Sequence, residues 1–265
     1  RDYMIELLSS AQEFIGENGF KGIRISTRPD AVDGEICDIL EKYHVTAVEL
    51  GAQSTNDKVL AMNRRGHTRE DIFRSARLLK ERGFELGLQM MTGLYGSNDE
   101  DSIGTARDII SLSPDTARIY PTVVIENTEL AELYRNGEYR PQTPEEAAVL
   151  CAKILPMFER AGIKVIRLGL HSGGDVEGSF VAGAYHPALR EMCEGHIYFD
   201  IINRALSGKE KGKYIIYVAP REVSKASGQR RCNIEKLREL GYECRIKENA
   251  ALSARDITLE KVNLL

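Results

Sequence analysis

The sequence lacks the short motifs that mark several common classes of protein. No apolar run reaches the roughly 18 residues that a membrane-spanning helix needs. No GxGxxG follows a first strand and no P-loop occurs, so nicotinamide and nucleoside-triphosphate chemistry lacks its usual support. The first residues, Arg1 to Tyr3, are not the basic and then apolar start of a secretory signal. These absences predict a chain with no membrane association.

Closely spaced cysteines are absent as well. The five cysteines are scattered, the nearest two are twelve residues apart, and neither CxxC nor CxxxCxxC occurs. An odd number of cysteines without paired spacing is typical of reduced, buried thiols. The cysteines therefore predict a cytoplasmic protein and give no sign of a metal site.

Positive charge is concentrated in one segment. The chain carries a net charge of −4, so it is not a basic surface for nucleic acid as a whole. Residues 207–231 contain seven basic and two acidic residues, a net +5, which leaves −9 for the rest. This asymmetry predicts two parts with different partners.

Apolar strands alternate with helical patterns over the first 170 residues. The strands are expected at 22–26, 47–50, 85–91, 117–120 and 163–168. Helices are expected at 3–15, at 34–43, at 68–82, from 99 or 102 onward, and at 143–161. Such alternation predicts a parallel sheet with right-handed crossovers. Five strands suit an open sheet or an incomplete barrel, since a full barrel needs about 250 residues.

The pattern changes after the fifth strand. Residues 171–195 are rich in glycine and predict a loop, and a helix is expected at 196–206. We therefore expect two domains: a partial (β/α) barrel over 1–195 and a small basic unit over 196–265.

The C-terminal segment reads as strand, short helix, glycine turn, helix and strand over residues 214–248. This βααβ order resembles the core of a KH RNA-binding module, whose GXXG loop clamps a nucleic-acid backbone. Here the turn has arginine in place of the second glycine, and the residues expected to contact RNA are Lys225, Gly228, Gln229, Arg230 and Arg231. The alternative is a small βααβ cap with a solvated basic face.

Polar clusters follow the first two strands of the alternating region. They read S-T-R-P-D at 26–30 and V-E-L-G-A-Q-S at 48–54. N-R-R-G-H-T at 63–68, Q-M-M-T-G-L-Y-G at 89–96 and I-Y-P-T-V-V-I at 119–125 follow in order. Together the five segments resemble radical S-adenosylmethionine (SAM) enzymes, above all the Elongator catalytic-subunit and oxygen-independent coproporphyrinogen III oxidase types.

This resemblance implies a partial barrel that binds SAM and a [4Fe–4S] cluster at the carboxyl ends of its strands. In such enzymes the cluster reduces SAM to give a 5′-deoxyadenosyl radical, while the protein positions both groups. It also implies a role for Gln53 at the SAM site and for Arg65 on the methionine carboxylate. Two alternatives stay open: Gln53 could merely cap its loop, and the adjacent Arg64 leaves the register uncertain by one.

The remaining cofactor residues also come from the resemblance. Gln89 stands where relatives often carry an aspartate for the ribose hydroxyls, and Tyr120 to Val123 would lie beside the adenine. Ser26 stands where relatives usually show glutamate, so this SAM contact is shortened and uncharged. Gln89 could equally be a hydrogen-bonded structural residue.

The three cluster cysteines of the family are missing from this chain, as is its GG motif. We therefore expect part of a longer enzyme, which by itself binds no cluster and does not turn over. It should also expose an apolar strand edge and inner face where two preceding strands belong, and such an edge invites self-association.

The function that this reading predicts is SAM-dependent radical chemistry on a tRNA base. One alternative is a small-molecule enzyme of the coproporphyrinogen-oxidase type, which would not need the basic segment. Another is a non-catalytic RNA-binding protein on a degenerate barrel. His67 and His171 are weak candidates for acid–base catalysis, with His171 slightly preferred because it follows a strand end.

Overall fold

The computed structural model describes residues 1–170 and 178–262 and divides the chain into two compact units. The first unit comprises residues 1–142 and 154–185, and the second comprises residues 143–153 and 186–265. Helix α7 (Pro144–Arg160) contributes to both units. The domain boundary predicted at residue 195 falls inside helix α9 (Leu189–Leu206), which belongs to the second unit.

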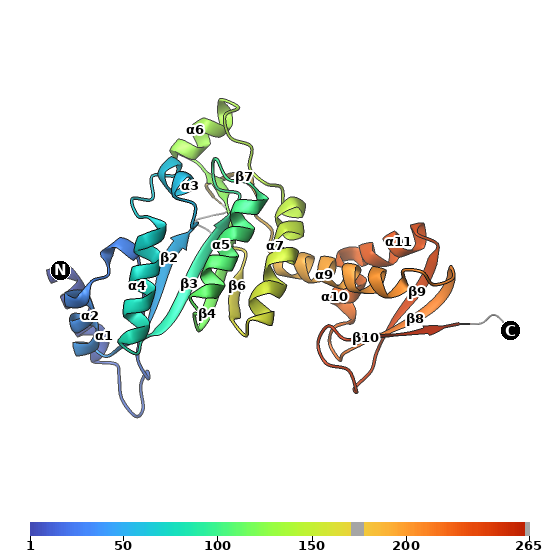
Figure 1. The fold of residues 1–265 in the computed structure, drawn as a ribbon, viewed down its shortest axis with the longest axis horizontal. Helices are drawn as coiled ribbons and strands as arrows, with labels where there is room; N and C mark the ends of the chain where they lie inside the picture. Colours follow the sequence, from blue (N-terminus) through green and yellow to red (C-terminus); the bar gives the residue numbers. More distant parts are fainter. Residues whose placement is uncertain (171–177, 263–265) are drawn as a thin grey trace. The chain divides into compact units, whose positions relative to one another are not determined.

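A parallel five-stranded sheet forms the centre of the first unit (Figure 1). Its strands run in the order β1-β2-β3-β4-β6, and all neighbouring pairs are parallel. The strands are β1 (Ile23–Thr27), β2 (Val45–Gln53), β3 (Glu85–Thr92), β4 (Thr116–Pro121) and β6 (Lys164–Leu168). The parallel α/β architecture predicted from the alternation is confirmed.

The helices of this unit begin where the sequence supplies capping residues. Thr68 and Asn98 each form a capping box with the aspartate three residues later, and Asp33 caps with its carboxylate. The helices are α1 (Asp2–Gln12), the 3-10 turn η1 (Pro29–Ala31), α2 (Gly34–Lys42), α3 (Asp57–Met62), α4 (Arg69–Glu81), α5 (Asp99–Ser111) and α6 (Glu129–Arg135). The short helices α3 and α6 were not among those predicted.

Helices α2, α4 and α5 cover one face of the sheet, as Figure 1 shows for α4 and α5. Alternate strand residues on that face are fully buried, among them Val48, Leu50, Leu86, Leu88 and Ile119. We call the opposite face of the sheet the inner face. It carries Ser26, Glu49, Gly87, Gln89 and Arg118, which neighbouring strands place in register.

The inner face is therefore polar, and the prediction of an apolar inner face is wrong. Strand β1 does lie at the edge of the sheet, but its exposed residues Arg24 and Ser26 are polar. Polar side chains remain stable on a face that water or a ligand can reach. Pairing of this edge with a second copy stays a prediction.

A small antiparallel pair extends the first unit. Strand β5 (Val123–Ile125) pairs with β7 (Phe180–Gly183). The loop predicted over 171–195 is therefore wrong at 180–183 and again from Leu189, where α9 begins, and residues 171–177 lie outside the described residues. Gly183 adopts φ +115, and a Cβ there would lie 3.0 Å from the Thr122 oxygen and from the Val123 Cα. This glycine serves close strand packing, which the sequence pattern does not distinguish from a loop signal.

The second unit packs its elements around a core of its own. Strands β8 and β9 are parallel and β10 is antiparallel to β8, in the order β10-β8-β9. The core includes Tyr198, Ile202, Leu206, Ile216 and Leu237. Beyond α9, the elements are β8 (Gly212–Val218), α10 (Val223–Ser227), the 3-10 turn η2 (Gln229–Arg231), α11 (Cys232–Glu239), β9 (Tyr242–Glu248) and β10 (Ile257–Lys261).

The predicted βααβ order is present, but the resemblance to a KH core is not confirmed. The third strand β10 was not predicted, and helix α9 begins seven residues before the expected start at 196. None of the helices that the structure describes is long and apolar enough to cross a membrane.

Candidate functional site

The end of strand β2 holds a glutamine amide in a constrained position. Gln53 is 4% exposed and adopts a left-handed backbone with φ +63. This conformation costs a non-glycine residue about 1–3 kcal/mol, and such residues cluster at functional sites. A Cβ at Gly51 would lie 2.8 Å from the Gln53 Nε2, so the missing side chain leaves room for the amide. The Gln89 Nε2 donates to the Gln53 Oε1 at 3.3 Å.

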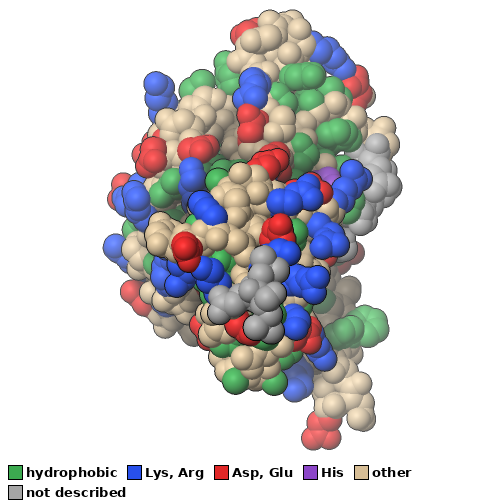
Figure 2. Space-filling view, turned by 90° about the vertical axis from the view of Figure 1, so that its right-hand side faces the viewer, with side chains coloured by type: hydrophobic (Ala, Val, Ile, Leu, Met, Phe, Trp, Pro, Cys, Tyr) green, Lys and Arg blue, Asp and Glu red, His purple; other side chains and the backbone are tan. Residues whose placement is uncertain are grey.

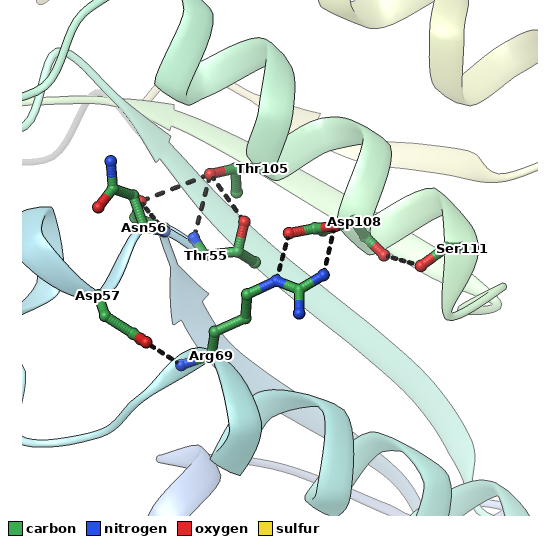
Figure 3. Close-up of polar contacts among 8 residues, drawn as sticks. Thr55, Asn56, Asp57, Arg69, Thr105, Asp108 and Ser111 are labelled. Carbon is green, nitrogen blue, oxygen red and sulfur yellow. Dashed lines mark hydrogen bonds and ion pairs between the residues drawn. The ribbon is translucent and has the colours of Figure 1, made fainter.

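A polar cluster fastens the loop that follows Gln53 (Figure 3). The Thr55 amide donates to the Thr105 Oγ1 at 3.1 Å, which ties the loop to helix α5. Arg69 donates two hydrogen bonds of 2.8 Å to Asp108, and its amide donates to Asp57 at 2.6 Å. These contacts join the loop, α4 and α5, so the Gln53 amide is positioned before any ligand binds.

His67 supports the same loop from within. Its Nε2 lies 3.0 Å from the Ala52 carbonyl oxygen, to which it donates, and the residue is 4% exposed. The Nδ1 atom is buried without a hydrogen-bond partner among the described residues. This contact makes His67 a positioning residue for the strand end and gives no support to a role in proton transfer.

Arg65 and its neighbour Arg64 differ in their surroundings. Arg64 is exposed and forms an ion pair with Glu129 at 2.8 Å. Arg65 is half-buried, and its Nε is buried without a hydrogen-bond partner in the part of the chain that the structure describes. Burial and the nearby Arg28 lower the pKa of Arg65, while Arg28 itself is paired with Asp30. Arg65 is thus the arginine that an anionic ligand group would neutralise.

The other residues predicted to bind SAM do not contact one another as Gln53 and Gln89 do. Ser26 is exposed on β1 in register with Glu49, and the half-buried Tyr120 accepts a hydrogen bond from the Arg118 Nη1 at 3.3 Å. Val123 lies outside the five-stranded sheet, in β5. Among the described residues, no hydrogen bond or ion pair joins Arg65 or Val123 to the Gln53–Gln89 pair.

Two charged residues on the inner face were not singled out from the sequence. The Arg118 Nε lies 3.0 Å from the Glu49 Oε1, and Glu49 is 1% exposed. Burial raises the pKa of Glu49, which Arg118 and Arg24 only partly oppose. A signal was available, because Glu49 interrupts the apolar run at 47–52 and Arg118 lies between the apolar residues Ala117 and Ile119.

Comparison with protein families identifies the chain. A model described as the radical SAM superfamily matches residues 1–109, and one described as the Radical_SAM C-terminal domain matches residues 114–198. The chain belongs to the radical SAM superfamily. The resemblance found in the five sequence segments is thereby confirmed.

Curated relatives place this radical SAM chain beside proteins of the Elongator type. It is 36% identical to a tRNA uridine(34) acetyltransferase of Methanocaldococcus jannaschii over 142 residues, which cover 51% of this chain and 26% of that protein. It is 34% identical to human Elongator complex protein 3 over 146 residues, 51% of this chain and 25% of that protein. The chain thus matches about a quarter of the length of these relatives.

A solved archaeal structure supports the radical SAM fold. Elp3 of the archaeon Methanocaldococcus infernus with an N-terminal deletion aligns with a TM-score of 0.61 at 24% identity, covering 75% of this chain and 55% of that one. The coproporphyrinogen III oxidase HemN from Escherichia coli aligns with a TM-score of 0.48 at 18% identity, over 60% of this chain and 37% of that one. That similarity is too low to support the small-molecule alternative.

SAM and a [4Fe–4S] cluster are the cofactors of radical SAM enzymes, and the described residues suit them unequally. The Arg65 guanidinium, which has no partner among the described residues, and the buried Gln53 amide suit the polar groups of SAM. Over residues 1–170 and 178–262, no group of three or more His, Cys, Asp or Glu could hold a metal ion. Burial raises the pKa of the Cys244 thiol to about 11, so it is no ready thiolate. These residues do not suit a cluster. His171, the weak candidate for acid–base catalysis, lies outside the described residues.

The turn between α10 and α11 presents only part of the residues expected to contact RNA. Gly228 is buried, and a Cβ there would lie 2.6 Å from the Cys232 Sγ. The missing side chain therefore makes room for Cys232 and not for a nucleic-acid backbone. Lys225 is paired with Glu222 at 2.7 Å. Figure 2 likewise shows basic side chains interspersed with acidic ones.

Three residues of this turn remain exposed: Gln229, Arg230 and Arg231. Both arginines adopt left-handed backbones, with φ +52 and +65. Neither arginine side chain forms an ion pair with another residue that the structure describes. They are the part of the turn that stays available to phosphate groups.

Proposed function

We propose that this chain is the SAM-binding part of a radical SAM enzyme that modifies a base in tRNA. The observation that carries the proposal is the half-buried Arg65 guanidinium, which lacks a partner among the described residues although Arg64 and Arg28 beside it are both paired. A buried cation without a counter-ion is unfavourable, so a bound carboxylate would stabilise it. The methionine carboxylate of SAM is such a group.

The proposed roles of the remaining residues follow from their donors and acceptors. The Gln53 and Gln89 amides, already hydrogen-bonded to each other at 3.3 Å, would bind the zwitterion and the ribose hydroxyls. Ser26 would add a neutral hydroxyl contact, while Tyr120 and Val123 would lie beside the adenine. SAM would supply the adenosyl group, and the residues of this chain would bind and orient it.

The tRNA part of the proposal is supported by the relatives, whose names refer to tRNA uridine(34) and to Elongator. In the second unit we assign phosphate contacts to Gln229, Arg230 and Arg231, which are exposed on one turn. Arginine suits phosphate because its planar fork binds two oxygens at once. Lys225 would contribute only by leaving its pair with Glu222.

Two binding measurements on the intact chain test this function. Calorimetry should detect saturable binding of SAM, and filter binding should detect tRNA with an affinity that falls steeply as salt rises. Replacing both arginines, R230Q with R231Q, should reduce the salt slope by about 2, because each lost phosphate contact releases one counter-ion fewer. The matched control K213Q removes a lysine that is paired with Glu243 and should leave the slope nearly unchanged. Absence of SAM binding would contradict the proposal. Absence of tRNA binding would contradict the assignment of tRNA as the substrate.

A further inference from the structure

Two arginines lie side by side on the inner face of the sheet. Arg118 on β4 pairs in register with Arg167 on β6, so both side chains leave the sheet on the same face. Leu168, which follows Arg167, pairs with Ile119 on the face that the helices cover, and both of these residues are buried. Neighbouring strands are about 4.8 Å apart, so the sheet holds two positive charges close together. Like charges on adjacent strands destabilise a sheet, and this arrangement therefore indicates a use for the pair.

Only one of the two arginines has a counter-ion among the described residues. The Arg118 Nε lies 3.0 Å from the Glu49 Oε1, and the Arg118 Nη1 donates to the Tyr120 hydroxyl at 3.3 Å. Arg167 is half-buried, and its side chain forms neither an ion pair nor a hydrogen bond with another residue that the structure describes. A half-buried cation beside a second cation is unfavourable, and a bound anion would stabilise it.

The sheet holds Glu49 in a position from which it can orient Arg118. Glu49 pairs in register with Gly87 on β3, and a Cβ at Gly87 would lie 3.2 Å from the Glu49 Cγ. The missing side chain lets Glu49 extend across β3 towards Arg118 on β4. The Glu49 side chain is 1% exposed and that of Arg118 is 31% exposed, so the carboxylate is covered while the guanidinium can be reached by a ligand. Glu49 is thus a positioning residue, and ligand contacts fall to the arginines.

The register also places the arginine pair next to the residues proposed to bind SAM. Gln89 pairs with Arg118, so Gln89, Arg118 and Arg167 form one row across β3, β4 and β6. Gln89 is hydrogen-bonded to Gln53 at the end of β2. Arg167 is the second-last residue of β6, close to the carboxyl ends of the strands, where parallel α/β folds bind their ligands. A ligand held by the two arginines would therefore lie beside SAM on the same face.

We propose that Arg118 and Arg167 bind a phosphodiester group of the RNA substrate on the inner face of the sheet. Two arginines and the ionised Glu49 leave one positive charge, which matches the single negative charge of a phosphodiester. The guanidinium forks suit its two non-bridging oxygens. Arg24 on β1 faces the same side but is already paired with Glu85. This inference rests on the proposed function, since it states which residues hold the backbone of the substrate beside SAM.

The test uses the intact chain carrying R230Q and R231Q, which removes the phosphate contacts proposed for the second unit. The probe is a labelled abasic trinucleotide, which has the RNA backbone without bases, titrated by fluorescence anisotropy with SAM present. We expect saturable binding that the further change R167Q weakens by about tenfold or more, the usual loss for a charge-assisted hydrogen bond. The same trinucleotide with uncharged methylphosphonate linkages should show no binding.

R24Q is the matched control, because Arg24 lies on the same face of the sheet but is paired with Glu85. Its affinity for the trinucleotide should equal that of the parent chain. Urea denaturation without ligand gives a second readout. Because R167Q removes the repulsion from Arg118, its free energy of unfolding should be equal to or greater than that of the parent, whereas a purely structural Arg167 would make R167Q less stable.

The contrary outcomes can be told apart. Unchanged trinucleotide affinity in R167Q, with SAM still bound, rejects the phosphate site and leaves the proposed function standing. Weaker binding of SAM but not of the trinucleotide by R167Q assigns Arg167 to SAM and rejects the phosphate site as well. Tighter binding of ribose 5-phosphate than of the trinucleotide would overturn the assignment to a phosphodiester. Failure to bind SAM, while R167Q still weakens the trinucleotide, contradicts the proposed function and not the phosphate site.

Discussion

Two glycines on the inner face determine where the functional side chains lie. Gly51 leaves room for the Gln53 amide, and Gly87 leaves room for Glu49. Both sit inside strands, where a glycine normally weakens the sheet, and both are explained by a side chain that occupies the vacant Cβ position. The inner face is thus shaped as much by missing side chains as by present ones.

The substitution G51A should displace the Gln53 amide, because the added methyl group would lie 2.8 Å from its nitrogen. We expect SAM affinity to fall by about tenfold, the equivalent of one lost hydrogen bond of about 1.4 kcal/mol. Calorimetry measures the change. G104A is the control, since nothing lies within 4 Å of its Cβ and alanine favours a helix. Equal SAM affinity of G51A and the wild type would contradict this role for Gly51.

The buried carboxylate of Glu49 predicts a specific dependence of stability on pH. Its pKa is raised above the ordinary value of 4.5, so the folded chain holds this proton more tightly than the unfolded chain. The free energy of unfolding should therefore fall as the pH rises from 4.5 through the raised folded pKa. In E49Q this contribution is absent. As the pH rises over that window, the free energy of unfolding of E49Q should therefore increase relative to that of the wild type. Parallel urea-denaturation curves across the window would contradict the prediction.

Among the elements, helix α4 shows how capping fixes the loop of the site. Thr68 accepts a hydrogen bond from the Asp71 amide and donates to the Asp71 carboxylate, and both contacts fix the start of α4, three residues after Arg65. Hydrogen bonds from the Thr68 amide and hydroxyl lower the pKa of Asp71 below its ordinary value of 3.8. The stability that these hydrogen bonds contribute is present above pH 3.8 and is lost as the pH falls through the lower pKa of folded Asp71.

Replacing the cap with T68A should destabilise the chain by about 1 kcal/mol at neutral pH. The difference from the wild type should shrink under strong acid, when Asp71 becomes protonated. T68S retains the hydroxyl and should recover most of the stability. Urea denaturation at neutral and acid pH measures both effects, and a loss that is equal for T68A and T68S would show that the hydroxyl is not the stabilising group.

The long periodic elements could be predicted from the sequence, and the short ones could not. Strand β3 and helix α4 follow apolar periodicity and capping residues within a residue or two. Strands β5 and β7, with three and four residues, are too short to show a period, and β10 depends on pairing with the distant β8. Tertiary contacts, not local sequence, produce these elements.

The residues of the candidate site could likewise be predicted from the sequence only in part. Gln53 and Gln89 were identified from their segments, and the structure brings them together. The pairing of Glu49 with Arg118 was missed, because it joins β2 to β4 across an intervening strand. Arg64 and Arg65 differ in their partners only in the fold, and the role of Arg65 on the SAM carboxylate stays a prediction.

At the scale of the whole molecule, the chain joins a radical SAM unit to a smaller unit with its own core. The central claim, which is a proposal, concerns the first unit: Arg65, which has no ion-pair partner among the described residues, binds the carboxylate of SAM. Charge-assisted hydrogen bonds contribute about 1.5–3 kcal/mol, so the claim predicts a large effect from one side chain.

The most direct test is calorimetric titration of the intact chain with SAM in the wild type, in R65Q and in R64Q. The account predicts that R65Q binds SAM at least about tenfold more weakly, whereas R64Q, which loses only an exposed pair with Glu129, binds like the wild type. Unchanged affinity in R65Q, or a greater loss in R64Q, would contradict it.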